Sequence, residues 1–370
     1  MSHFCLLREP EKYVAHNWDL LQDQASRQHW LDLFANHFQE TLKHARTQYG
    51  RAATRQIATA GRQFAEAIEQ LRKDPAGLPG GKLDVLELCR LRERILRQNK
   101  LNDPFGYIKA RENASAAMLY PQVVRKLHAM NGQAKWLHLV ECVFAGNVFD
   151  LGSPATMHTA EESPDFLATI EKTKPRPWLV DDYDLLAKDL LPAPPTKWGK
   201  AVVFADNAGS DFLLGLMPLA RELALCGTKI VLAANELPSL NDVTADEAAQ
   251  QVELLAAIDA DLAALLSAGM FEVVSTGNDV PLIDLSSVTD ELNQAAADAD
   301  LVILEGMGRA VESNFDAKFT VDALQLALLK DPAVASRIGG QVYDCVCKYT
   351  PRDSNQQPVT SNQEPVTSNQ

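Results

Sequence analysis

The fold of this 370-residue chain is decided by two short stretches, KAVVFADN at residues 200–207 and DLVILEGMGR at residues 300–309. Each begins with an apolar run typical of a buried parallel β-strand, and each ends abruptly in polar or charged residues. Ligands bind at the carboxyl ends of the parallel strands in an open α/β sheet. Asp206 and Asn207 follow the first run, and Glu305 to Arg309 follow the second. These stretches therefore predict a site for a phosphate ester and a hard or borderline cation at one edge of a sheet.

From residue 200 onward, strand-like runs alternate with helical ones. The predicted strands after KAVVFAD are TKIVLAAN, FEVVSTG, DLVILEG and QVYDCVCKY. Helices are expected over 210–226 and 244–268, and near 286–298 and 316–331. This alternation predicts an α/β fold with a doubly wound, mostly parallel, Rossmann-like sheet that carries helices on both faces.

The rest of the chain divides by composition. Residues 1–150 predict an all-helical N-terminal domain, because apolar residues recur at helical spacing, for example at Trp30, Leu33, Phe34, Phe38, Leu42 and Tyr49. Residues 151–198 contain PRPW and LPAPPTKW and are expected to be a connector. Residues 199–350 form the predicted α/β metal- and phosphate-binding domain. The tail, 351–370, repeats PVTSNQ and is expected to be disordered because it has almost nothing apolar to bury.

Charge and composition exclude several classes of partner. The formal net charge is −14, which argues against a nucleic-acid or anionic-membrane surface. Residues 200–350 hold 23 Asp and Glu against 8 Lys and Arg, so this half can hold cations. The first residues lack a secretory h-region, and the six cysteines are scattered, which predicts a reduced, cytoplasmic protein. Cys345 and Cys347 suit a strand core better than a metal pair.

The segment FADNAGSD, residues 204–211, offers the first metal-binding motif. A carboxylate and an amide oxygen at Asp206 and Asn207 suit a divalent ion, and the small residues that follow let a phosphate approach backbone N–H groups. The alternative is an Asx turn that caps the next helix. Asp242, in the loop after the next strand, is the third candidate ligand, and its alternative is the N-cap of the helix near Thr244.

The segment EGMGR, residues 305–309, does not complete a dinucleotide fingerprint, because Val311 stands where the last glycine belongs. Its glycines allow a tight turn that aims Glu305 and Arg309 inward, and arginine can grip a phosphate through two parallel hydrogen bonds. The alternative is a loop with a solvated arginine. Lys330, expected at a helix end, is a weaker candidate for binding phosphate.

Together, FADNAGSD, LAANELPSLNDVT, STGNDVPLIDLS, LVILEGMGR and GGQVYDCVCKY resemble the DUF89 family of metal-dependent damage-control phosphatases. EGMGR is the label of its eukaryotic subfamily II, which includes stand-alone plant proteins and the C-terminal domain of a pantothenate kinase-like protein. The resemblance runs from about residue 85 to about residue 350, and the segment before about residue 80 departs from it. We find no kinase domain and expect a stand-alone form.

The resemblance implies roles for particular residues. It implies metal ligation by Asp206, Asn207 and Asp242, and a substrate cleft at Glu305, Gly306, Met307, Gly308 and Arg309. On the helical side it matches polar positions at Glu112, Asn113, Asn147 and Asp150. It also implies Mn²⁺, Ni²⁺, Co²⁺ or Mg²⁺ as the ion, and as substrates 4′-phosphopantetheine, its oxidised forms, or sugar phosphates.

The resulting hypothesis is a metal-dependent phosphatase that acts on small phosphorylated metabolites. Asp206 would act in catalysis by holding the ion, which would bind a phosphoryl oxygen and lower the pKa of a bound water. Arg309, and more weakly Lys330, would stabilise the charge on the phosphoryl oxygens. The alternative is a non-catalytic nucleotide- or metabolite-binding α/β protein, or a methyltransferase, since fold alone cannot choose. The preferred ion, the physiological substrate, the attacking group and the oligomeric state stay open at this point.

Overall fold

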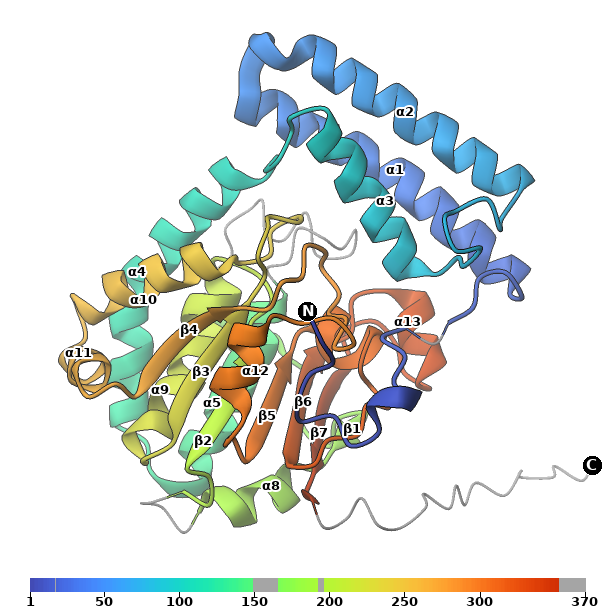
Figure 1. The fold of residues 1–370 in the computed structure, drawn as a ribbon. Helices are drawn as coiled ribbons and strands as arrows, with labels where there is room; N and C mark the ends of the chain where they lie inside the picture. The colour runs from blue at the N-terminus through green and yellow to red at the C-terminus, as the bar shows by residue number, and fades with distance from the viewer. Residues whose placement is uncertain (17, 149–165, 192–195, 353–370) are drawn as a thin grey trace, which may run out of the picture.

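The computed structural model describes residues 1–16, 18–148, 166–191 and 196–352. At its centre is a seven-stranded sheet in the order β1-β7-β6-β5-β2-β3-β4, in which only the β6–β7 pair is antiparallel among the described strands. The strands are β1 (Val180–Asp181), β2 (Lys200–Phe204), β3 (Lys229–Ala234), β4 (Phe271–Ser275), β5 (Leu301–Glu305), β6 (Asp322–Leu328) and β7 (Cys345–Thr350). The predicted doubly wound, mostly parallel sheet is confirmed (Figure 1).

The helices surround this sheet and extend beyond it. They are α1 (Gln24–Tyr49), α2 (Thr54–Lys73), α3 (Val85–Gln98), α4 (Gly106–His128), α5 (Gly132–Asn147), α7 (Phe166–Lys172), α8 (Tyr183–Leu190), α9 (Met217–Leu225), α10 (Ala245–Ala256), α11 (Ala260–Ser267), α12 (Asp290–Ala296) and α13 (Pro332–Arg337). The described residues also contain four short helices: η1 (Pro10–Lys12), η2 (Gly50–Ala53), η3 (Asp211–Leu216) and η4 (Met307–Glu312). Both η3 and η4 are π-helical, a form that is frequent at functional sites.

Two apolar cores lie on opposite faces of the sheet. Val202 and Phe204 of β2 pack into the core that includes α12 and the N-terminal helices, whereas Ala201 and Val203 pack into the core with α5 and α9. This alternation is what a strand buried on both faces requires. Cys345 and Cys347 of β7 are buried in the second core, in agreement with the expectation that they are core residues.

Helices α1 to α3 form a unit that projects beyond one edge of the sheet (Figure 1). Phe38 of α1 stacks on Phe64 of α2 with ring centroids 4.0 Å apart, which joins the two long helices. By contrast, α4 and α5 pack along the sheet unit, and α5 lies against η3 and α9. The predicted helical character of the N-terminal region is confirmed, whereas the exact division into domains stays a prediction. The predicted disordered tail, apart from residues 351–352, lies outside the described residues.

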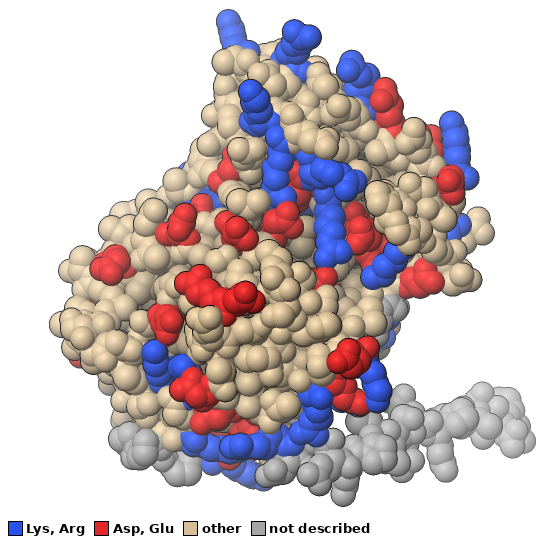
Figure 2. All heavy atoms as spheres, viewed as in Figure 1, with Lys and Arg blue, Asp and Glu red and all other residues tan. Residues whose placement is uncertain are grey.

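Helix α3 is fastened to the strand-end loops of the sheet by arginines. Arg90 forms an ion pair with Asp284 at 2.7 Å, and Arg97 pairs with Asp279 and donates to its carbonyl oxygen at 2.7 Å. Acidic and basic side chains are interspersed on the face drawn in Figure 2, including the region where the projecting helices approach the sheet unit. The ion pairs of Arg90 and Arg97 hold α3 above the carboxyl ends of the strands. None of the helices in the described ranges is long and apolar enough to cross a lipid bilayer.

One predicted element is wrong. The helix expected over 316–331 is absent, and residues Asp322–Leu328 form β6, which is buried along its whole length between β5 and β7. The segment DALQLAL is rich in residues that favour helices, and a short apolar run does not reveal its period. Pairing with two neighbouring strands overrides the local preference. Lys330 therefore follows a strand end rather than ending a helix.

Candidate active site

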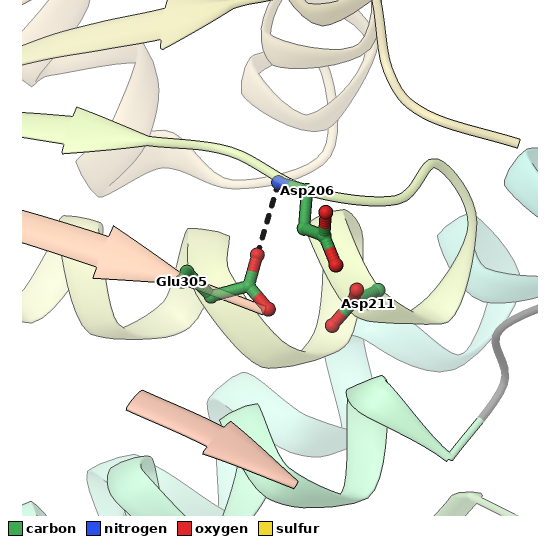
Figure 3. A group of neighbouring side chains, drawn as sticks. All are labelled: Asp206, Asp211 and Glu305. Atoms are coloured by element: carbon green, nitrogen blue, oxygen red, sulfur yellow. Dashed lines mark hydrogen bonds between the residues drawn. The ribbon is translucent and has the colours of Figure 1, made fainter. Parts of the chain in front are cut away.

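The polar strand ends predicted from the sequence meet at the point where the strand order reverses. Strand β2 lies between β3 and β5, and the chain winds outward in both directions from the β2–β5 pair. Asp206 follows β2, and Glu305 is the last residue of β5. Such a switch point is where a doubly wound sheet opens a crevice for ligands. Figure 3 shows the carboxylates of Asp206, Asp211 and Glu305 gathered at this edge.

These three carboxylates are all buried, and one oxygen of each lies within 4.8 Å of the others. Glu305 Oε2 accepts a hydrogen bond from the Asp206 backbone N at 3.0 Å, which ties the end of β5 to the end of β2. Burial, and then repulsion by the Asp211 carboxylate, hold the pKa of Glu305 well above its ordinary value. Concentrated buried negative charge of this kind requires protons or cations to offset it. The donors fit a divalent ion that prefers oxygen ligands.

Two asparagines orient this cluster. Asn207 Nδ2 donates to Asp206 Oδ2 at 2.9 Å and to Asp211 Oδ2 at 2.8 Å. Asn147, at the end of α5, donates to Asp211 Oδ1 at 2.8 Å and also to Glu305. Because the side-chain Nδ2 of Asn207 donates to two carboxylates, its side-chain oxygen, Oδ1, is directed away from them. That oxygen accepts no hydrogen bond from the part of the chain that the structure describes.

Arg309 joins the two carboxylates predicted to be metal ligands. Its Nη1 donates to Asp206 Oδ1, and its Nη2 donates to Asp242 Oδ2 at 2.8 Å and to Asn235 Oδ1 at 3.2 Å. The Pro281 carbonyl oxygen lies 3.3 Å from Nη1. Arg309 is 1% exposed, so its charge and the two carboxylate charges offset each other away from water. The alternative of a solvated arginine is therefore wrong.

The loop after β3 brings Asp242 to Asn207. The two residues pair in an isolated antiparallel bridge, and Ala208 N donates to the Asn241 carbonyl oxygen at 2.9 Å. The N-cap of α10 is Thr244, which forms a complete capping box, so Asp242 is not the cap. Asp242 is 1% exposed and faces the arginine instead.

On the helical side, Asn113 of α4 accepts a hydrogen bond from Gly209 N at 2.7 Å, which holds the loop after β2. Glu112 lies against the same glycine: a Cβ on Gly209, where φ is +77°, would lie 2.9 Å from Glu112 Cβ. Asp150, also matched by the resemblance, lies outside the described residues.

Residues after β6 complete the rim. Lys330 is 1% exposed, and its positive charge opposes the rise in the pKa of Glu305, so it lies near the acidic cluster. Its backbone N lies 3.1 Å from Met307 Sδ. Gly308 packs closely on the Pro281 carbonyl oxygen, which a Cβ at position 308 would approach to 2.8 Å.

The structure adds residues that the sequence did not single out. Asp211 closes the acidic cluster, and Asn235 helps to hold Arg309 and donates to Asp242 Oδ2 at 2.9 Å. Asp211 is the last residue of FADNAGSD, so its place one turn beyond Asn207 was a usable signal. Nothing in the local sequence distinguishes Asn235 from an ordinary loop asparagine.

A cavity of about 110 Å³ adjoins the predicted ligands. Asp206, Asn207 and Asp242 line it from the sheet unit, and side chains of α1 and α3, among them Trp30 and Phe34, line it from the projecting helices. Helices α1 and α3 therefore roof the site at the carboxyl ends of the strands.

Comparison with known proteins agrees with this geometry. A family model described as the damage-control phosphatase ARMT1-like domain matches residues 27–346. The chain is 40% identical over 323 residues to a damage-control phosphatase of Arabidopsis thaliana, covering 86% of this chain and 87% of the relative. It is 32% identical over 397 residues to a 4′-phosphopantetheine phosphatase of Mus musculus, covering 93% of this chain and 48% of the relative. It thus spans about half of that mouse protein.

A crystal structure of a DUF89 family protein from Pyrococcus horikoshii has a TM-score of 0.60 at 20% identity, covering 86% of this chain and 96% of that one, and it shows a shared fold. The family model and these relatives place the chain among the phosphatases of metabolite damage control. The chain belongs to the damage-control phosphatase ARMT1-like domain family, which confirms the resemblance noted in its sequence. The match begins at residue 27, so the expectation that the resemblance starts only at about residue 85 is wrong.

Proposed function

We propose that this phosphatase hydrolyses small phosphate monoesters with one divalent ion bound at Asp206, Asn207 and Asp242. The observation that carries the proposal is the convergence of Asp206 and Asp242 on a single buried cation, the Arg309 guanidinium. Two buried carboxylates that share one positive group suit a site for positive charge. The free carbonyl oxygen of Asn207 supplies a neutral third ligand beside them.

In this proposal Asp211, Glu305 and Asn147 support the ligands without binding the ion. Their hydrogen bonds fix the orientation of Asn207 and the backbone of Asp206. Partners that orient ligands in this way tune metal affinity.

The chain's own groups would bind the phosphoryl oxygens. Arg309 already lies between the ligands, and its planar fork suits a phosphate. Lys330 adds a second buried cation near the cluster. The divalent ion supplies Lewis-acid stabilisation of phosphoryl charge. Gly306, Met307 and Gly308 are the proposed substrate-side backbone, with Asn113 and Asn147 holding the facing elements.

We propose 4′-phosphopantetheine, its oxidised forms or sugar phosphates as the substrates, and Mn²⁺, Ni²⁺, Co²⁺ or Mg²⁺ as the ion. The name of the mouse relative supports the first of these substrates. A cytoplasmic location is supported by the six free cysteines, four of which are buried. Family membership favours this function over the non-catalytic binder or methyltransferase considered from the sequence.

The test measures phosphate release from 4-nitrophenyl phosphate by metal-stripped protein to which each of the four ions is returned. We expect activity only with added ion, and a loss of at least about 100-fold in Asp206→Ala, equivalent to about 2.7 kcal/mol of transition-state stabilisation. Asp246→Ala, on the exposed start of α10, is the control. Full activity of folded Asp206→Ala would refute the proposal.

A second measurement separates the proposed ligand set from the acidic cluster of Asp206, Asp211 and Glu305. Isothermal titration with Mn²⁺ should show affinity at least about tenfold weaker in Asp242→Asn, since a charged ligand is lost. Asp211→Asn keeps one of the two oxygen acceptors and should weaken the affinity less than Asp242→Asn does, because Asp211 orients a ligand without binding the ion. The reverse order would assign the ion to the acidic cluster.

A further inference from the structure

The cavity beside the proposed metal ligands contains buried polar atoms that the protein leaves without partners. Asn241 is 1% exposed, and neither its Nδ2 nor its Oδ1 has a hydrogen bond in the described structure. Trp30 of α1 is 4% exposed, and its Nε1 likewise has no partner among the described residues. Both residues line the same cavity. Buried polar groups in native proteins are nearly always paired, so these atoms call for a ligand or an ordered water.

Asn241 lies next to one of the proposed metal ligands in the chain. It precedes Asp242, and its carbonyl oxygen accepts from Ala208 N at 2.9 Å, so its backbone is fixed between the two loops that carry the proposed ligands. Trp30 lines the cavity from α1, one of the two helices that cover the site. The two side chains therefore reach the cavity from different parts of the fold, Asn241 from the sheet unit and Trp30 from the projecting helices.

The remaining wall is mixed. Its apolar part is formed by Leu33, Phe34, Val85, Leu240, Leu282 and Met307, and the ionisable side chains of His37, Arg92, Glu312 and Asp331 also line the cavity. An amide that can both donate and accept and a single indole donor, with apolar side chains beside them, match a group that carries a hydroxyl or carbonyl on a hydrocarbon frame.

We propose that this cavity receives the alcohol portion of the phosphate ester, and that Asn241, assisted by Trp30, selects esters with a hydroxyl or amide close to the ester carbon. This inference rests on the proposed function and deepens it by assigning the determinant of specificity. A site whose polar atoms are buried and unpaired rejects a substrate that lacks the matching group, because the atoms then stay unpaired in the complex. An ester of a purely hydrocarbon alcohol would leave them so.

The test uses two probes that differ by one hydroxyl group: 2,2-dimethylpropyl phosphate and 3-hydroxy-2,2-dimethylpropyl phosphate. The readout is the ratio of their kcat/KM values, with the activating ion present. The wild-type protein should prefer the hydroxylated probe by at least tenfold. In Asn241→Leu, which keeps the branching and the number of side-chain heavy atoms and removes the amide, the ratio should fall to twofold or less, and Trp30→Phe should lower it in part.

The matched control is Asn278→Leu. Asn278 is 7% exposed and also has a buried, unpartnered Nδ2, but it does not line this cavity, so its loss should leave the ratio unchanged. If Asn241→Leu does not fold, Asn241→Ala is measured in the same way, and Trp30→Phe gives an independent reading.

Failure of this inference is distinct from failure of the proposed function. Metal-dependent release from both probes without any preference, or a preference that survives in a folded Asn241 variant, overturns the role of Asn241. Absence of release from both probes and from 4-nitrophenyl phosphate counts against the phosphatase assignment itself.

Discussion

Gly306 presses directly against Asp206: a Cβ at position 306 would collide with the Asp206 carboxylate, and the glycine has a φ of +91°. The chain turns from β5 into η4 at this residue, and a side chain at the turn would occupy the space of the Asp206 carboxylate. Only a residue without a side chain satisfies both requirements.

Gly306→Ala is therefore expected to displace Asp206 and to lower kcat/KM for 4-nitrophenyl phosphate by at least about 100-fold, since small misplacements at a reacting centre are this costly. Gly339→Ala is a matched control, because Gly339 has a φ of +77° and a Cβ there would have no atom within 4 Å. It should cost about 1 kcal/mol of stability, with unchanged activity. Equal losses of activity in the two variants would mean that backbone strain, not contact with Asp206, is responsible.

Arg309→Met tests whether the arginine offsets the ligand charges. Without the guanidinium, the buried carboxylates of Asp206 and Asp242 lose the positive charge that they share, and the metal-free protein should lose about 3–5 kcal/mol of stability. Because a bound ion would restore the balance, we expect a larger rise in Tm on adding Mn²⁺ than in the wild-type protein, together with greatly reduced turnover. The measurement is thermal unfolding with and without the ion.

The control for that experiment is Arg176→Met. Arg176 pairs with Asp181 at 2.8 Å and Asp184 at 2.9 Å, on a segment that contributes nothing to the site. Its loss should leave the ion-induced rise in Tm as it is in the wild-type protein. If adding Mn²⁺ raises the Tm of Arg309→Met no more than that of Arg176→Met, the ion does not replace the charge of the missing arginine, and the proposal is contradicted.

Asn147→Ala should destabilise the fold by about 2–4 kcal/mol, since it leaves Asp211 and Glu305 without their shared donor in a buried place. Urea-induced unfolding measures this free energy. Asn131→Ala serves for comparison, because Asn131 is exposed and makes no capping hydrogen bond through its side chain. A similar, small effect for both variants would show that the network around Asn147 contributes little.

The raised pKa of Glu312 predicts that the free energy of unfolding decreases as the pH rises. Burial, and then repulsion by Asp331, raise the pKa of Glu312 to about 8 from an ordinary value of 4.5. Between these two values the folded state keeps the proton while the unfolded state loses it. The contribution of Glu312 to the free energy of unfolding is therefore fully present below about pH 4.5 and is lost as the pH rises to about 8. The slope is at most about 1.4 kcal/mol per pH unit.

Nearby His16, whose pKa burial lowers to about 4 from 6.5, acts in the opposite direction between those two values, so the clean window lies between pH 6.5 and 8. Glu312→Gln should remove the decline in this window and be more stable than the wild-type protein at pH 8. The free energy of unfolding in urea, measured at several pH values, checks this. A decline of equal slope in Glu312→Gln would assign the effect to another group.

Local sequence predicted the elements whose apolar runs are unambiguous. KAVVF and LVILE form β2 and β5, and the polar residues after them lie at the switch point of the sheet. The segment DALQLAL was assigned wrongly as a helix because its residues favour helices and only pairing with β5 and β7 makes it a strand. The proposed ligands were found because strand direction brings the carboxyl ends of parallel strands to one edge.

The sequence by itself therefore determined the class of sheet and the edge at which Asp206, Asp242 and Arg309 meet, because burial of apolar runs and strand polarity are local properties of the chain. Only the tertiary structure decided that Arg309 bridges the two carboxylates, that Asp211 joins them, and that Trp30 and Asn241 line one cavity. These relationships depend on packing between segments as many as 211 residues apart, from Trp30 to Asn241, and no local pattern encodes such distances.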